Sequence, residues 1–133
     1  MDAPWSIDSW TFTDGVPPPV APYAHATAAG PLVFVTGQLP IDPVTDEVVG
    51  AQDVIAQTNQ VMANLEVVLD RTGSDLGKAL MVRAYLTAMD LYDDFNRTYA
   101  SWFPDRLPSR TCVSVTGLAR GCWVEVDLIA LRA

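Results

Sequence analysis

The sequence is poor in the residues that build metal and redox centres. It holds one histidine, His25, and two cysteines, Cys112 and Cys122, without a Cys-x-x-Cys pair. A zinc site needs three or four such ligands, so no zinc ligand set is present. A glycine-rich phosphate loop is also missing. We therefore expect no metal, no organic cofactor and two reduced thiols.

Basic residues and long apolar runs are scarce as well. Asp and Glu number 16 against 8 Lys and Arg, which gives a formal net charge of −8. This balance disfavours nucleic acid as a partner, because nucleic acid binds basic surfaces. No apolar run approaches the ~18 residues that cross a bilayer, and the first residues lack the basic and apolar regions of a signal peptide. We expect a cytoplasmic protein that binds neither nucleic acid nor membranes.

A chain of 133 residues allows one domain. Its composition shifts only at the start, where Trp5 and Trp10 precede the proline run 17–19. Proline cannot donate to a central strand ladder, so residues 1–19 are expected to form an N-terminal arm or a first edge strand. Residues 20–133 are then expected to form the single domain.

Hydrophobic periodicity predicts strands and helices in the order ββαβαββ. A hairpin is expected from 24–29 and 32–38, followed by a loop over 40–50, a helix over 53–72 and a strand over 80–87. Asp90 is expected to cap a second helix that ends before Pro104. The last strands, 108–116 and 123–128, are expected to pair as a hairpin broken by Gly117 and Gly121.

The predicted elements make an α+β fold in which both helices cover one face of a single sheet. The other face would carry Phe34, Met81, Tyr85 and Trp123. These side chains are too apolar for open water, so the pattern predicts self-association without specifying the number of subunits.

The last two strands carry the residues best suited to chemistry. Alternation places Arg110 and Cys112 on one face of the first strand, and Glu125 and Asp127 on one face of the second. In a hairpin these groups could converge on the same side. An arginine binds a carboxylate through two parallel hydrogen bonds, and a nearby glutamate can move a proton, so the pattern indicates chemistry on a small acid. The residues alone leave open that Arg110 is a surface ion-pair partner and Glu125 a solvated strand residue.

Four segments carry a resemblance that runs from about residue 19 to residue 130. They are Pro-Ser-Arg-Thr-Cys-Val at 108–113 with Val-Glu-Val-Asp at 124–127, Ala-Pro-Tyr at 21–23, Leu-Val-Phe-Val-Thr-Gly-Gln-Leu-Pro at 32–40, and Gln57-Thr58 with Asn64-Leu65. In this order and spacing they resemble the RidA/YjgF/UK114 family of enamine/imine deaminases.

The resemblance implies a chorismate-mutase-like fold that assembles as a homotrimer, with the sheets facing inward and the sites in clefts between subunits. It implies that Arg110 binds the substrate carboxylate and that Glu125 orients or activates the attacking water. It also implies that the pocket wall includes Tyr23 from an adjacent subunit, Thr36, Gly37 and Cys112. Asp127 is expected to be structural, and Gly37 could instead mark only a strand bulge.

The implied reaction is hydrolysis of a 2-aminoacrylate/2-iminopropanoate type of intermediate to a 2-oxo acid and ammonia. It needs no cofactor, because an imine is already an electrophile. Where the family shows Gly-Pro-Tyr-Ser-Gln, residues 21–25 read Ala-Pro-Tyr-Ala-His, so the substrate stays open and His25 lies either beside the pocket or on the trimer surface. The alternatives are a larger, aminomuconate-like enamine acid, or a catalytically silent trimer that binds small carboxylates or a protein partner.

Overall fold

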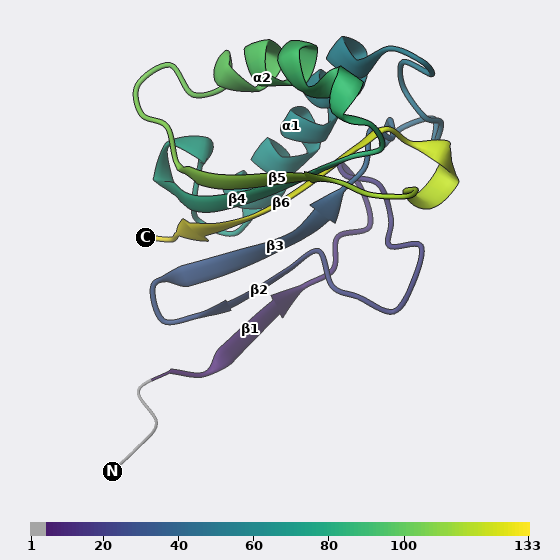
Figure 1. Cartoon of the computed structure of the whole chain (residues 1–133). Helices are drawn as coiled ribbons and strands as arrows, with labels where there is room; N and C mark the ends of the chain where they lie inside the picture. Colours follow the sequence, from purple (N-terminus) through teal and green to yellow (C-terminus); the bar gives the residue numbers. More distant parts are fainter. Residues whose placement is uncertain (1–4) are drawn as a thin grey trace.

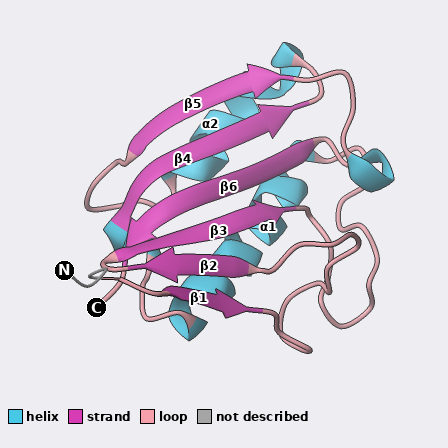
Figure 2. Ribbon diagram, turned by 90° about the horizontal axis from the view of Figure 1, so that it is seen from below, coloured by secondary structure: helices cyan, strands magenta, loops and turns pink. Residues whose placement is uncertain are grey.

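A sheet of six strands forms the centre of the fold, and both α-helices pack against the same face of it (Figures 1 and 2). The computed structural model describes residues 5–133. Its elements are β1 (Ile7–Trp10), β2 (Ala26–Ala29), β3 (Leu32–Gln38), α1 (Val54–Arg71), η1 (Leu76–Lys78), β4 (Ala79–Leu86), η2 (Met89–Leu91), α2 (Tyr92–Ala100), β5 (Ser109–Ser114), η3 (Ala119–Gly121) and β6 (Val124–Leu131). The α+β class and the single sheet expected from the sequence are confirmed. Neither α-helix is long and apolar enough to cross a membrane.

The strand order is β1-β2-β3-β6-β4-β5, and only β4 and β5 run parallel. The expected hairpin between the last two strands is wrong, because β4 lies between β5 and β6 (Figure 2). A parallel pair needs a crossover connection, and α2 supplies it between β4 and β5. This crossover places β5 at the sheet edge and leaves β6 to pair with β3 and β4. Alternation within each strand carries no information about which strands are neighbours.

Helix α1 follows the predicted span closely. The Asp53 side chain caps its first turn by accepting hydrogen bonds from the backbone N–H groups of Ile55 and Ala56, both at 3.1 Å. Gly73 follows its end with a φ of +85°, a conformation that suits glycine. The side chains that repeat at helical spacing face the sheet and are buried: Val54, Val61, Met62, Leu65, Val68 and Leu69.

Helix α2 begins differently from the prediction. Asp90 lies inside the short turn η2, and its side chain caps neither η2 nor α2. Acidic residues in the first turn of α2, Asp93 and Asp94, still complement the helix dipole as expected. The buried side of α2 carries Phe95 and Tyr99, which pack into the main core.

The face of the sheet away from the helices stays open in the single chain. Phe34 is 41% exposed on this face, and Met81 and Tyr85 are half-buried. Trp123, which was expected there, is half-buried and packs against the main core. The uncovered face therefore keeps the apolar surface from which self-association was predicted.

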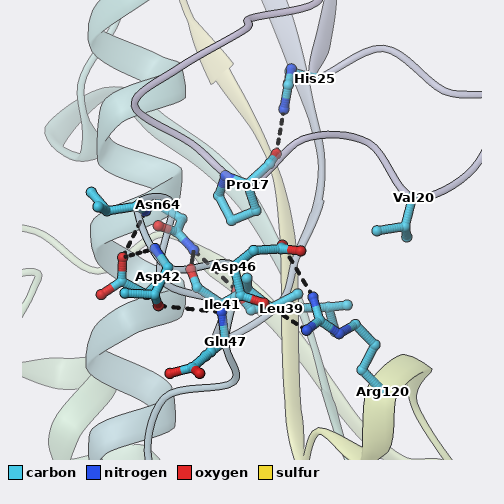
Figure 3. A network of polar contacts seen from close by, with 12 residues as sticks. Pro17, Val20, His25, Leu39, Ile41, Asp42, Asp46, Glu47, Asn64 and Arg120 are labelled. Carbon is cyan, nitrogen blue, oxygen red and sulfur yellow. Dashed lines mark hydrogen bonds and ion pairs between the residues drawn. The ribbon is translucent and has the colours of Figure 1, made fainter.

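Contacts far apart in sequence hold the loop between β3 and α1 in place. The Asn64 amide on α1 donates to the carbonyl groups of Leu39 and Ile41, at 3.1 and 3.0 Å (Figure 3). On the other side of the loop, Arg120 donates to the Asp46 carbonyl at 2.7 Å. The loop is thereby tied both to α1 and to the turn that leads into β6.

His25 fixes the segment that precedes β2. It is 1% exposed and lies outside the cavity described below, so both positions considered for it, beside the pocket or on the surface, are wrong. Its Nδ1 accepts from the Phe12 backbone N–H at 2.9 Å, and its Nε2 therefore donates to the Pro17 carbonyl at 2.8 Å (Figure 3). Its own backbone N–H donates to the Trp10 carbonyl at 2.8 Å, next to the edge strand β1.

We expect His25→Ala to lower the free energy of unfolding by about 2–4 kcal/mol, because two backbone groups lose their partner and a cavity remains. Urea unfolding followed by circular dichroism measures the change. Thr27→Ala, at an exposed position of β2, is the control and should stay within about 0.5 kcal/mol of the parent. An equally small effect of His25→Ala would mean that other contacts hold the segment.

Candidate functional site

A close contact between β3 and β6 marks the centre of the candidate site. The register of this strand pair shifts between Val35 and Gln38, and Gly37 lies in that irregularity. A Cβ atom added at Gly37 would lie 2.2 Å from Oε2 of Glu125. With any larger residue at position 37 the Glu125 carboxyl group would have to move away, so Gly37 combines the strand irregularity with a close approach to a polar group.

A solvent-accessible cavity of about 400 Å³ opens beside this contact. It is lined by side chains and backbone from the segment before β2 and from β2, β3, β4 and β6: Tyr23, Ala24, Ala26, Thr27, Phe34, Val35, Thr36, Gly37, Arg83 and Asp127. The structure therefore brings together Tyr23, Thr36 and Gly37, three of the residues predicted from the sequence, and places Glu125 against the last of them. Tyr23 is 38% exposed, and its hydroxyl accepts from the Val20 N–H at 3.2 Å.

The environment of Glu125 favours its neutral form. Burial raises the pKa of its carboxyl group, and the nearby negative charge of Asp127 raises the pKa further. Within residues 5–133 no hydrogen-bond donor reaches this carboxyl group. A carboxyl group that is partly desolvated and uncommitted to a protein partner is suited to exchanging a proton with a substrate or a water.

We expect Glu125→Gln to raise the free energy of unfolding at pH 7 relative to the parent. The pKa of Glu125 is higher in the folded chain than its ordinary value of 4.5, so the parent loses stability as pH rises through that value and up to the folded pKa. The stability difference between the two proteins should therefore shrink below pH 4.5. Urea titrations at several pH values measure it. A constant difference across this range would contradict the assignment, and the exposed Glu66→Gln serves as the control.

Arg110 lies on the opposite side of the sheet from Glu125. On β5 it pairs with Val82 of β4, whereas Glu125 of β6 pairs with Tyr85 of β4. Directly paired residues share a face, and Val82 is a fully buried residue of the helix-covered face. The expectation that Arg110 and Glu125 converge on one face is therefore wrong within a single chain.

Helix α2 holds the Arg110 guanidinium. Its Nη2 donates to Asn96 Oδ1 at 2.8 Å and to the Tyr92 hydroxyl at 3.3 Å. The guanidinium carbon lies 4.9 Å from the Tyr99 ring centroid and 5.5 Å from that of Phe95. These rings provide cation–π contacts that favour the charge without neutralising it with a carboxylate.

Cys112 shares the helix-covered face with Arg110. It pairs with the buried Ala84 of β4 and is half-buried. Burial raises the pKa of its thiol, and the Arg110 charge opposes that change without reversing it. The thiol is therefore not activated as a nucleophile, and Cys112 does not line the cavity described above.

Comparison with known proteins assigns the family. The profile of the family described as "Endoribonuclease L-PSP" matches residues 14–132. A RutC family protein of Sulfurisphaera tokodaii is 37% identical over 121 residues, covering 91% of this chain and 96% of that protein. The chain therefore belongs to the L-PSP family. The resemblance to RidA/YjgF proteins is thereby confirmed.

Two further members of the family carry more specific names. The 3-aminoacrylate deaminase RutC of Acinetobacter baylyi is 35% identical over 117 residues, covering 88% of this chain and 92% of that protein. The crystal structure of RidA from Psychrobacter sp. superposes on this chain with a TM-score of 0.87. The two sequences are 27% identical, and the match covers 93% of this chain and 99% of that one. The family thus includes deaminases.

Three polar side chains of the candidate site were not identified as such from the sequence, those of Arg83, Tyr85 and Asn96. Asp127 Oδ1 accepts from Arg83 Nε at 2.7 Å, and its Oδ2 accepts from the Tyr85 hydroxyl at 3.0 Å. The signal was a charged residue, Arg83, in the middle of the otherwise apolar strand 80–87. Asn96 had no comparable signal, because its role follows from the packing of α2 beside β5. Among residues 5–133 no cluster of His, Cys, Asp and Glu side chains is arranged to hold a metal ion.

Proposed function

We propose that this protein hydrolyses reactive enamine/imine acids of the 2-aminoacrylate/2-iminopropanoate type to 2-oxo acids and ammonia. The observation that carries the proposal is the Glu125 carboxyl group set against Gly37 at the edge of a cavity that also contains Tyr23 and Thr36. Membership of a family that includes a 3-aminoacrylate deaminase supports the same reaction class.

The site is completed by a second copy of the chain. Arg110 lies on the edge strand β5, next to a groove of about 250 Å³ that includes Asn96, Tyr99 and Leu107. Glu125 and Gly37 lie on the other face of the sheet, so one chain cannot direct both a guanidinium and a carboxyl group at one small ligand. When β5 of one subunit borders the open sheet face of its neighbour, Arg110 meets the cavity of that neighbour. A closed ring of three such contacts is the homotrimer that the family resemblance implies.

The reaction needs a water to add to the imine carbon and a proton to reach the nitrogen. Arg110 binds the substrate carboxylate and orients the C=N bond, while Cys112 contributes to the wall. Glu125 accepts a proton from the attacking water as the C–O bond forms, and it returns the proton to the nitrogen. The resulting carbinolamine passes its hydroxyl proton through Glu125 to the NH2 group as the C–N bond breaks, so that ammonia leaves and the carbon becomes the carbonyl of the 2-oxo acid. The raised pKa of Glu125 helps it to act in both directions.

Glu125→Gln should lower turnover by about 10²–10⁴-fold, because the amide cannot carry the proton, while a carboxylate ligand still binds within about threefold of the parent. Arg110→Lys keeps the charge but loses the planar fork, and should cost about 2–5 kcal/mol of transition-state stabilisation. Ammonia release is measured while an amino-acid oxidase or dehydratase supplies the imine. Full turnover by Glu125→Gln would assign water activation to another group.

Mixing inactive variants tests the shared site. In trimers refolded from equal amounts of Arg110→Ala and Glu125→Gln chains, about a quarter of the subunit interfaces pair an intact Arg110 with an intact Glu125. Activity should therefore return on mixing, although each variant alone is inactive. Light scattering should give about three times the chain mass of 14.4 kDa. A monomeric mass, or mixtures as inactive as their parts, would overturn the site shared between subunits.

A further inference from the structure

We infer that Arg83 binds a second anionic group of the substrate, so that the preferred substrate is a dicarboxylic enamine or imine acid. The inference rests on the proposed function and names the substrate class of the same site. It starts from the only guanidinium that lines the described cavity, which is that of Arg83.

The position of Arg83 suits a ligand that reaches beyond the reacting carbon. On β4 it pairs with Asp127, while Tyr85, two residues further along, pairs with Glu125. Alternation puts both pairs on the open face, and two residues of a strand span about 6.6 Å. A chain of a few carbon atoms bridges that separation. A ligand with its imine carbon near Glu125 can thus place a distal carboxylate at Arg83.

The hydrogen bonds around Arg83 leave its binding surface available. Only Nε is committed, to Asp127 Oδ1, and within residues 5–133 the two terminal nitrogens donate to nothing. The Arg83 side chain is 59% exposed, whereas that of Asp127 is 14% exposed. Asp127 also accepts from Tyr85, so its charge is directed at two donors of its own chain. The terminal nitrogens of Arg83 present the two-pronged donor geometry that a carboxylate accepts.

A purely structural role explains this arrangement less well. A largely exposed ion pair contributes about 0–1 kcal/mol to stability. Arg97, paired with Asp94 on the exposed side of α2, is an ion pair of that kind and lies outside the described cavity. Arg83 differs in two ways. Its carboxylate partner, Asp127, is itself held by the Tyr85 hydroxyl. The pair also lines a cavity that includes Gly37, the residue against which the Glu125 carboxyl group lies.

The test compares succinate with butanoate, which have the same number of carbon atoms but differ by one carboxylate. Calorimetric titration of the parent trimer should give at least about tenfold tighter binding of succinate. In Arg83→Gln this preference should disappear while the affinity for butanoate stays within about twofold. Arg83→Lys should retain part of the preference, and the matched control Arg97→Gln should retain all of it.

Three results would overturn the inference: no preference for succinate in the parent, an equal loss for both ligands in Arg83→Gln, or dissociation of the oligomer in both Arg83 variants. The last would assign Arg83 to the contact between subunits. Ammonia release separates this inference from the proposed function. A parent that hydrolyses monocarboxylic imines without a preference for succinate keeps the function and loses the inference. A parent that shows the Arg83-dependent preference but hydrolyses no imine keeps the second anion site and loses the function.

Discussion

Every strand of this sheet can bury only one of its two faces against α1 and α2. In β4 and β6 that face consists of Val82, Ala84 and Leu86, and of alternate residues from Val124 to Ala130, all at most 1% exposed. Burying one large aliphatic side chain contributes about 1.5–3 kcal/mol, so turning either strand over would forfeit several such contributions at once. The polar residues between them are therefore held on the open face. The position of Glu125 is a consequence of the burial of its two valine neighbours.

The same constraint, applied at the sheet edge, separates the two charged groups that the proposed chemistry needs. Arg110 lies on the helix-covered face because the residue paired with it on β4, Val82, is buried on that face. On an edge strand this face is only partly covered, and the guanidinium rests on the aromatic rings of α2 with one amide partner, Asn96. Such an environment keeps the charge oriented and leaves it without a carboxylate partner. The proposed chemistry therefore requires assembly of several chains, which would also cover apolar surface.

Much of the fold could be predicted because its signals are local. The span of α1 follows from a capping aspartate, a helical repeat of apolar residues and Gly73, and each lies within a few residues of the feature that it determines. The start of α2 was harder to predict. Asp90 is a residue type that often caps helices, but it lies inside the short 3-10 turn η2 that precedes α2. His25 was misplaced for a related reason. Its burial depends on the backbone of Phe12 and Pro17 folding back over it, which no local pattern reveals.

The amino-acid pattern alone was enough to predict the α+β class, the span of α1 and the presence of an arginine, a glutamate and a glycine in a recognisable order. Side-chain alternation and helical periodicity are properties of neighbouring residues, so they can be derived without knowing the fold. Three relations became visible in the folded chain and not before. Strand β4 lies between β5 and β6, Arg110 and Glu125 occupy opposite faces, and Arg83 shares a cavity with Gly37. These relations depend on strand order and register, which arise from the crossover through α2 and from packing across the whole sheet.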